Sequence, residues 1–370
     1  MRAAVYHGRR DVRVEELPDP VPSPGELVLE IHAAGVCGSD AKEFAEGPFA
    51  IPLHGKHPVT GHGGPTVLGH EIAGRVVAIG RGVEGFELGE VVACGGGMSC
   101  GTCRPCRAGR TNLCTSYATL GHHRHGGLAQ FCAVPSSICL SVRPFGLEED
   151  AAALAQPMAI AVHAASQARL TGGSSALVIG VGGIGAPLVY VLASQGIEVT
   201  VVDLRTDRLA LARELGAAST VVPAEGTRIA EVLAGDGIRR PEAVFEVSGS
   251  EAGLLDALDS VDPGGQVVAV GLHAVPRAID VRRLTLRELQ LHGTNAHAFA
   301  TDLPRALSLL AARHSGWGDL APCALTLEEV VPSALVPLAE GASRQVKYLV
   351  DPFAALARPA SCGVYPASAP

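Results

Sequence analysis

The pattern of apolar and polar positions changes once along the chain, near residue 154. Before this point, short β-rich runs such as GELVLEIHAAG and EIAGRVVAIG are separated by Pro and Gly clusters, and helical periodicity is nearly absent. This spacing is typical of all-β or barrel-like folds. After it, the runs ALVIG, EVTVVD, STVV, AVFEV, QVVAV and ELQLHG alternate with segments of helical spacing such as TDRLALARELG. The second region is therefore predicted to be α/β, with a doubly wound parallel sheet of six strands.

The C-terminal part departs from this alternation. After Thr294 the pattern predicts a helix over DLPRALSLLAAR and a final strand over QVKYLVDP, and the last residues, RPASCGVYPASAP, look like a loose end. The simplest arrangement returns this tail to the N-terminal domain. We therefore expect a discontinuous β-rich domain over residues 1–153 and 295–370, and an α/β domain over residues 154–294.

A glycine motif follows the first strand of the α/β region and opens a helix. It contains Gly180, Gly182 and Gly185, with Gly183 and Ile184 inside the turn. The first glycine permits a tight turn, the second lets the backbone approach a pyrophosphate, and the third lets helix and strand pack closely. The helix N-terminus adds N–H donors. The motif predicts a dinucleotide site, and an ordinary glycine turn is the structural alternative.

An acidic residue ends the next predicted strand, at Asp203. A carboxylate at this position accepts hydrogen bonds from the ribose hydroxyls of NAD and repels the 2′-phosphate of NADP. NAD is therefore the expected cofactor and NADP the less favoured one, although Arg205 and Arg208 soften this discrimination if they point inward. Further candidate cofactor contacts are Arg208, Ser248 and Gly271.

Four cysteines, Cys100, Cys103, Cys106 and Cys114, lie in one loop rich in Gly, Arg and Pro. Four soft ligands at this spacing suit tetrahedral Zn²⁺, and a site filled by four protein ligands has no open position for substrate. The loop therefore predicts a structural zinc. An iron–sulfur cluster is the competing interpretation, but the known cluster spacings do not match this loop.

A second group of metal-binding residue types is divided between two segments. Cys37 lies in GVCGSD, and His70 with Glu71 lies in LGHEIAG. One thiol and one imidazole are too few for a closed site but suit a catalytic zinc that keeps a position open for water or an alcohol. The alternatives are that Cys37 is a small buried apolar residue and His70 a hydrogen-bonded core histidine.

The segments GVCGSD, LGHEIAG, the four-cysteine loop and GVGGIG resemble the zinc-dependent medium-chain dehydrogenase/reductase (alcohol dehydrogenase) family in order and distance, over nearly the whole chain. The stretch GPFAIPLHGKHPVTGHGGPTVLGHEIAG is most similar to the butanediol and sorbitol (polyol) branch. The resemblance implies a GroES-like catalytic domain, a Rossmann NAD-binding domain, and a structural and a catalytic zinc ion, two per chain. It also implies reversible NAD(P)-dependent oxidation of a secondary alcohol, diol or polyol, with Ser39 relaying the proton of the alcohol.

Two positions depart from the family pattern. Gln156, in LAQPMAIAVHA, stands where the polyol branch commonly has a glutamate, so the last protein ligand of the catalytic zinc becomes a neutral amide unless Glu71 supplies a carboxylate. Lys42 stands where relatives often have a relay histidine, and a surface role is its alternative.

Histidines also gather in two loops. His122, His123 and His125 lie in TLGHHRHGGLAQF, which the resemblance places near the substrate cleft. One of them is therefore a candidate for lining the pocket or supplying the relay base, whereas solvated loop histidines are the alternative. The loop before His70 is interpreted in the same way, and its histidines are His54, His57 and His62.

Composition narrows the expected partners. The chain has 370 residues, of which 47% are hydrophobic, and 29 Lys and Arg against 37 Asp and Glu give a net charge of −8. This balance disfavours nucleic acid and anionic membrane surfaces as partners. Residues 170–197 carry no formal charge, but their glycine breaks argue against a membrane span. The expected partners are a small-molecule alcohol or ketone and, by the habit of the family, further copies in a homodimer or homotetramer.

Cysteine usage and the N-terminal segment bear on location. Ten cysteines, four of them in one loop, are too few for a disulfide scaffold and fit a reducing compartment. The N-terminal residues carry charges where a signal peptide needs an apolar stretch. A cytoplasmic location is therefore expected.

Two other functions are compatible with the same fold. One is a non-catalytic nucleotide-binding protein, and the other is a zinc-independent reductase. Cys37, Ser39, His70 and Glu71 argue against the first, and the thiol loop together with His70 and Glu71 argues against the second.

Overall fold

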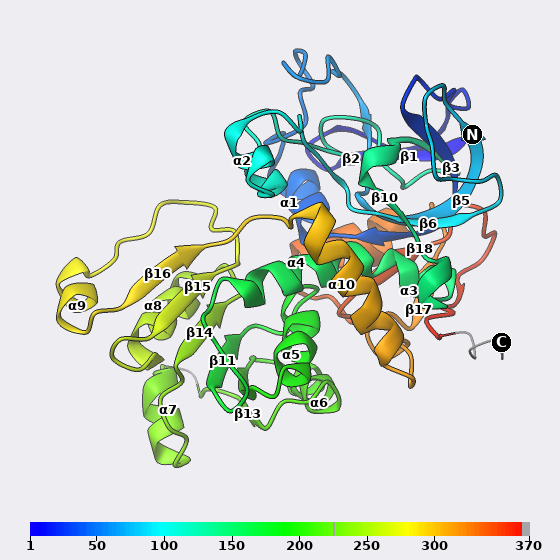
Figure 1. The fold of residues 1–370 in the computed structure, drawn as a ribbon. Coiled ribbons are helices and arrows are strands. Elements are labelled where there is room, and N and C mark those ends of the chain that lie inside the picture. Colours follow the sequence, from blue (N-terminus) through cyan, green and yellow to red (C-terminus); the bar gives the residue numbers. More distant parts are fainter. Residues whose placement is uncertain (225, 365–370) are drawn as a thin grey trace. The chain divides into compact units, whose positions relative to one another are not determined.

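The computed structural model describes residues 1–224 and 226–364 (Figure 1). The chain divides into two compact units, one formed by Met1–Ala159 with His297–Pro370 and the other by Ile160–Ala296. Helix α4 (Ala155–Ser166) contains the first boundary between them. Each unit has its own sheets and its own apolar core.

The first unit is built around an eight-stranded sheet with the order β10-β6-β5-β3-β18-β17-β19, in which β9 also pairs with β3. Strand β18 pairs antiparallel with β3, placing Tyr348 opposite Val36, so the C-terminal tail completes a sheet begun near the N-terminus. The strands are β3 (Glu26–Val36), β5 (Glu71–Ile79), β6 (Val91–Cys94), β9 (Phe131–Pro135), β10 (Cys139–Ser141), β17 (Cys323–Leu325), β18 (Tyr348–Val350) and β19 (Arg358–Pro359).

Smaller elements surround this sheet. A three-stranded sheet contains β1 (Arg2–Gly8), β2 (Asp11–Glu16) and β4 (Thr66–Val67), and a two-stranded one contains β7 (Gly97–Met98) and β8 (Ala118–Thr119). The helices are α1 (Gly38–Glu46), α2 (Arg104–Arg107), α3 (Glu149–Ala153), α10 (Phe299–Ala312) and α11 (Val336–Ala339), with a π-helical turn over Val330–Leu335. Leu27, Leu29, Ile31 and Ile72 of the large sheet are completely buried in the core of this unit.

Helix α1 shows that the expectation of almost no helix before residue 154 was incomplete. Its start is fixed by a local hydrogen bond, because the carboxylate of Asp40 accepts from the backbone N–H of Cys37 at 2.9 Å. Such reciprocal capping sets a helix start without a long apolar repeat. Ala41 and Phe44 then anchor the helix in the core. The cap also fixes the position of Cys37.

The second unit confirms the predicted doubly wound sheet. Its six strands are all parallel, in the order β13-β12-β11-β14-β15-β16 (Figure 1). They are β11 (Ser175–Ile179), β12 (Glu198–Val202), β13 (Ser219–Val221), β14 (Ala243–Glu246), β15 (Gln266–Ala269) and β16 (Gln290–Gly293). Its own helices are α5 (Gly185–Ser194), α6 (Thr206–Glu214), α7 (Ile229–Gly235), α8 (Glu251–Ser260) and α9 (Val281–Leu286). The strand order reverses between β11 and β14, and in such sheets ligands bind at this switch point, outside the carboxyl ends of the strands.

The C-terminal segment corrects a second expectation. Residues 358–364 are not a loose end, because Arg358 lies in β19 and its Nη1 donates to the buried carboxylate of Asp150 at 2.6 Å. Cys362 is also buried, with 4% exposure. Ion pairing, which apolar periodicity does not detect, holds this segment. Residues 365–370 lie outside the described part of the chain.

No helix in the described residues combines the length and the apolar character that a membrane crossing needs. The uncharged stretch over residues 170–197 forms β11, the glycine turn and α5.

Candidate active site and metal centres

The four-cysteine loop of the first unit brings its thiols together. The sulfur atoms of Cys100, Cys103, Cys106 and Cys114 all lie within 4.8 Å of one another. Backbone N–H groups point at the sulfurs, from Cys103 to Cys100 Sγ at 3.3 Å and from Cys100 to Cys114 Sγ at 3.2 Å. Such bonds stabilise thiolates, and hydrogen bonds from Thr102 and Cys103 lower the pKa of Cys100 to about 6. The donor set fits a tetrahedral thiolate site for zinc.

A second group of candidate ligands forms where β3, α1 and β5 meet. Cys37 follows β3 as the N-cap of α1, His70 directly precedes β5, and Glu71 is the first residue of β5. Their ligand atoms lie within 4.8 Å of one another. Gly35, the register partner of Glu71, leaves room for the group, because a Cβ atom at this position would collide with the Glu71 carboxylate.

A buried carboxylate, Asp40, lies behind His70. Its Oδ1 is 3.5 Å from Nδ1 of His70, and this geometry leaves Nε2 of the imidazole available for a metal. Burial alone raises the pKa of Asp40, but His70 and His122 lower it below its usual value. Burial alone lowers the pKa of His70, but Asp40 and Cys37 raise it well above its usual value. The raised pKa of His70 indicates a negative potential at the imidazole, made by Asp40 and Cys37, and such a potential favours a cation.

Lys347 was missed by the sequence analysis. It is 2% exposed, and its ammonium donates to Oε1 of Glu71, which is completely buried, and to the carbonyl of Val36 at 3.5 Å. Burial lowers the pKa of Lys347, but Glu71 and Cys37 raise it above its usual value. A charged residue inside the predicted strand QVKYLVDP was the only signal of this ion pair in the sequence.

Two buried oxygen atoms of the first unit, one in the candidate group and one on α4, lack hydrogen-bond partners among the described residues. Within the described residues, neither Glu71 Oε2 nor Gln156 Oε1 accepts a hydrogen bond. Gln156 lies in the first turn of α4 and is 6% exposed. A buried oxygen atom without a hydrogen-bond partner destabilises the fold, and a bound cation would remove this cost. Both atoms are therefore suited to coordinate a cation. The residues present therefore fit a zinc ion with mixed sulfur, nitrogen and oxygen ligands.

The two candidate relay residues differ in their surroundings. Ser39 is half-buried in the first turn of α1, two residues after Cys37. Lys42, also half-buried, places its ammonium 6.0 Å from the centroid of the Phe49 ring. This contact favours a packing role for Lys42 over proton transfer.

His122 is the member of the histidine loop that adjoins the candidate ligands. It is 8% exposed, its ring centroid lies 5.4 Å from that of His70, and its Nε2 lies 3.9 Å from Asp40 Oδ1. Burial, followed by the charge of His70, lowers the pKa of His122 to about 4. A neutral imidazole at this position can line a pocket and exchange hydrogen bonds with a hydroxyl group.

Four of the other loop histidines form two pairs. His57 and His123 stack at 4.2 Å between ring centroids, and His62 lies edge-on to His125 at 4.8 Å. Nδ1 of His123 accepts the N–H of Thr119 at 3.0 Å, and Nδ1 of His125 accepts the N–H of Val67 at 3.1 Å. These bonds hold both rings in fixed positions, so they are structural parts of the loops. His54 is exposed.

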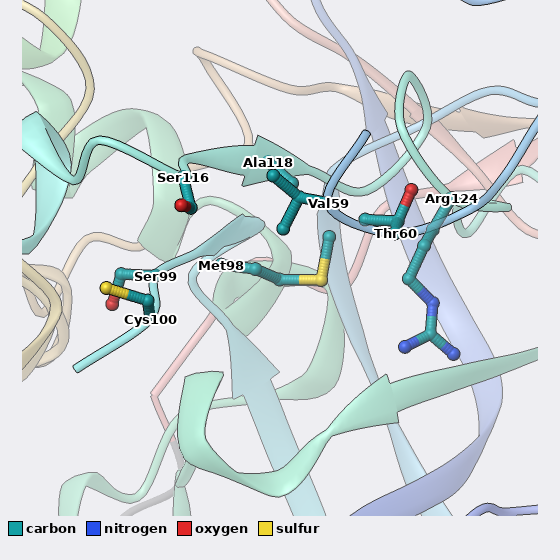
Figure 2. A pocket seen from close by; sticks show the side chains of 8 residues that line it. All are labelled: Val59, Thr60, Met98, Ser99, Cys100, Ser116, Ala118 and Arg124. Atoms are coloured by element: carbon teal, nitrogen blue, oxygen red, sulfur yellow. The ribbon is translucent and has the colours of Figure 1, made fainter. Parts of the chain in front are cut away.

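A cavity of about 350 Å³ lies beside the four-cysteine loop. Figure 2 shows its lining, with Met98 between Ser99, Cys100 and Ser116 on one side and Thr60 and Arg124 on the other. None of Cys37, His70 and Glu71 lines it. This cavity is therefore not the candidate metal site, which is defined by the residue types and the short distances of its ligand atoms.

The glycine turn of the second unit has the geometry of a phosphate cradle. Gly180 has a φ of +97°, which glycine adopts without strain, and a Cβ on Gly185 would collide with the carbonyl of Gly180. By contrast, nothing lies within 4 Å of the position of a Cβ on Gly182. This open space above the turn lets a ligand approach the backbone, so the turn fits a dinucleotide.

Asp203 lies at the end of β12 and is 8% exposed. Its Oδ2 accepts the N–H of Val181 at 2.7 Å and its Oδ1 accepts the N–H of Arg205 at 2.9 Å, so the carboxylate is oriented by the glycine turn itself. Nη1 of Arg208 lies 3.9 Å from Oδ2. The side chain of Arg205 pairs with Asp207, Nε to Oδ1 at 3.0 Å. Of the two arginines, Arg208 is the one beside the carboxylate.

Comparisons with known proteins agree with this chemistry. The family models for the alcohol dehydrogenase GroES-like domain and for zinc-binding dehydrogenases match residues 23–144 and 183–312. Sorbitol dehydrogenase of Bacillus subtilis is 30% identical over 317 residues, covering 84% of this chain and 86% of that protein. The crystal structure of 2R,3R-butanediol dehydrogenase from B. subtilis superposes with a TM-score of 0.86 at 28% identity, covering 95% of this chain and 99% of that one. An Escherichia coli alcohol dehydrogenase complexed with NADH has a TM-score of 0.83 at 26% identity, with coverage of 95% and 99%.

The chain therefore belongs to the zinc-dependent alcohol dehydrogenase family. It is an oxidoreductase of the zinc-binding dehydrogenase type that combines a GroES-like domain with a Rossmann-type parallel sheet. These findings confirm the family, fold and enzyme class expected from the sequence. They disfavour a non-catalytic nucleotide-binding protein and a zinc-independent reductase.

Proposed function

We propose that this protein oxidises a secondary alcohol, diol or polyol-like substrate to the ketone, with NAD as the hydride acceptor. The proposal rests on the group of Cys37, which is half-buried, and of His70 and Glu71, which are buried, because one carboxylate oxygen of Glu71 lacks a partner among the described residues. The names of the B. subtilis relatives, a sorbitol and a butanediol dehydrogenase, support this substrate class. The same groups serve the reverse reduction.

In the proposed mechanism each residue has one task. Cys37 and His70, with Glu71 or Gln156, hold the catalytic zinc. When bound, zinc lowers the pKa of the substrate hydroxyl, and the nicotinamide accepts the hydride. Asp40 orients His70 through Nδ1. Ser39 Oγ accepts the hydroxyl proton while it donates its own proton onward to solvent, so the serine stays neutral and the alcohol loses one proton.

Cys100, Cys103, Cys106 and Cys114 hold a structural zinc and take no part in the chemistry. The GroES-like catalytic domain is assigned to residues 1–153 and 295–370, and the NAD-binding domain to 154–294. Gly180, Gly182, Gly183, Ile184, Gly185, Asp203, Arg208, Ser248 and Gly271 are assigned to the cofactor.

A substrate panel with measurement of bound metal tests this function. Purified protein is assayed with NAD⁺ against diols, polyols, amino alcohols and cyclitols, and zinc per chain is measured before and after mild chelation. We expect two zinc ions initially, and loss of one together with the activity. A constant single zinc with unchanged activity would contradict the catalytic site.

The edge of the parallel sheet supports a homo-oligomer. Strand β16 ends the sheet, and its Leu291 is 38% exposed. Nearby in sequence, Leu272, Val281 and Leu286 are each more than 60% exposed. An uncovered edge strand with apolar neighbours favours pairing with a second copy, so a homodimer or homotetramer is expected. Light scattering of the eluting protein measures the mass directly, and a monomer would contradict this assignment.

A cytoplasmic location is proposed on the basis of the thiols. All ten cysteines are free, and four of them form the four-thiol cluster, which an oxidising compartment would convert to disulfides.

Replacement of Asp203 tests cofactor choice. The native protein should prefer NAD over NADP by on the order of 1.5 to 3 kcal/mol, or roughly one to two decades in kcat/KM, because the carboxylate bonds the ribose and repels the 2′-phosphate. Asp203→Ala should narrow the preference but also removes the bond from Val181, so Asp203→Asn is the cleaner variant. Comparable kcat/KM values for both cofactors in the native protein would refute the assignment.

Gln156→Glu tests whether the amide lies next to the zinc. A glutamate would add one negative charge to the metal site, which should slow zinc loss to chelators. The same charge should raise the pKa of the substrate hydroxyl, moving the alkaline rise of the oxidation rate to higher pH. If both observables stay unchanged, Gln156 is remote from the metal. Slower loss of zinc with an unchanged pH dependence of the oxidation rate would mean that the titration of another group controls this pH dependence.

A further inference from the structure

A buried glutamate lies at the carboxyl end of β14, beside the switch point of the parallel sheet. Glu246 is completely buried, and its Oε1 accepts from Ser248 Oγ at 2.5 Å and from the N–H of Gly249 at 2.9 Å. The carboxylate therefore fixes the loop that leaves β14. The apolar run AVFEV contains this acid as its only charged residue, a signal that the sequence analysis did not use.

The same residue also reaches the loop that leaves β15. Its other carboxylate oxygen, Oε2, lies 3.3 Å from Nε2 of His273. Its backbone carbonyl accepts the N–H groups of Val270 and Gly271 at 2.8 and 2.9 Å. A single residue thus connects two loops at the carboxyl edge of the sheet. Glu246 Oε2 and both ring nitrogens of His273 are buried and make no regular hydrogen bond among the described residues.

The loop that leaves β14 packs against the glycine turn, and the loop that leaves β15 packs against the loop that leaves β14. A Cβ on Gly180 would lie 3.1 Å from the backbone nitrogen of Ser248, and a Cβ on Gly271 would collide with Gly249. Three loops, leaving β11, β14 and β15, therefore stack against one another around the switch point. In a doubly wound sheet, the half that carries the acidic residue of β12 holds the adenosine, and the other half holds the second nucleotide.

We propose that Glu246 is a positioning residue for the nicotinamide half of the cofactor, acting through Ser248 and Gly249 and, with His273, through Gly271. This inference rests on the proposed function. A buried carboxylate that loses its charge loses strength in each bond it accepts, so the loops would lose their fixed spacing. Because the adenosine half is oriented by Asp203 through Val181, it should be unaffected.

The test compares a whole cofactor with its adenosine half on the purified, zinc-loaded protein. Glu246→Gln keeps the shape of the side chain and removes the charge. We expect the Kd of NADH, measured by its fluorescence, to rise on the order of tenfold, the effect of losing one charge-assisted bond. The Kd of AMP, measured by calorimetry, should change by less than about twofold, since its site lies outside the two loops.

A matched control lies at the other end of the same strand. Glu242 accepts from Ser174 Oγ at 3.0 Å and from the N–H of Ser175 at 3.2 Å, away from the switch point. Glu242→Gln should leave the Kd of both NADH and AMP unchanged. If Glu246 has only a structural role, Glu246→Gln should raise the Kd of NADH and of AMP by the same factor, or lower the melting temperature and leave both Kd values unchanged. Either result would overturn the proposal.

Variants of His273 provide a second measurement. His273→Phe should weaken NADH binding, and His273→Asn, which keeps a donor, should restore most of it. The double variant Glu246→Gln/His273→Phe should bind NADH about as weakly as Glu246→Gln alone, because the two side chains act as one unit. Fully additive effects would contradict the pairing. If the native protein binds neither NADH nor AMP, the proposed function itself fails, which is a distinct outcome.

Discussion

Cys37→Ser should give a folded protein without measurable dehydrogenase activity. A serine hydroxyl is a far weaker zinc ligand than a thiolate, and Cys37 supplies the only sulfur of the Cys37, His70 and Glu71 group. The helix cap should survive, because it uses the backbone N–H of residue 37 and the carboxylate of Asp40. We expect kcat/KM to fall by more than the roughly 10- to 100-fold that outer-shell changes cost. Initial rates combined with zinc analysis should show one zinc per chain instead of two.

Cys103→Ser is the matched control in the other metal group. The change breaks the four-thiol loop, so it should lower solubility or assembly and thermal stability more than it lowers the chemistry. Activity per correctly folded molecule should stay close to that of the native protein. The reverse pattern, with Cys103→Ser inactive but stable and Cys37→Ser active, would mean that the four-cysteine loop holds the catalytic zinc and that the Cys37 group does not.

Elements with regular apolar periodicity were predictable from the sequence. All six strands of the parallel sheet and helix α10 agree with their predicted segments. The inner strands β11, β12, β14 and β15 are largely buried, and burial on both faces makes such parallel strands continuous apolar runs. Helix α1 and strand β19 were not predicted, since capping by Asp40 and ion pairing of Arg358 define them. These interactions are local or long-range hydrogen bonds, and they leave no periodic trace in the sequence.

The residues of the candidate sites were also predictable only in part. Motif spacing led to Cys37, His70 and the glycine turn, because the chemistry of metals and phosphates constrains residue type at short separations. The residues that support them were missed. Lys347 pairs with Glu71 across 276 positions of sequence, and only the pairing of β18 with β3 brings this lysine to the site. Such partners follow from topology, which spacing alone cannot supply.

Lys347→Met should destabilise the metal-free first unit by about 3 to 5 kcal/mol, the usual cost of leaving a buried charge without its partner. Glu71 would keep a buried carboxylate without its ammonium partner. Trp317, the only tryptophan, is completely buried in the first unit, so its fluorescence during urea denaturation reports the unfolding of that unit.

Zinc should reduce this loss. If Glu71 belongs to the metal group, a bound cation replaces part of the missing positive charge, so the variant should be much closer to the native protein when zinc is present. The double variant Lys347→Met/Glu71→Gln removes both charges and should recover much of the metal-free stability, while holding the catalytic zinc more weakly. An equal loss of stability with and without zinc would place Glu71 outside the metal group and leave Gln156 to complete it. No loss at all would mean that the ammonium of Lys347 contributes nothing to the burial of Glu71.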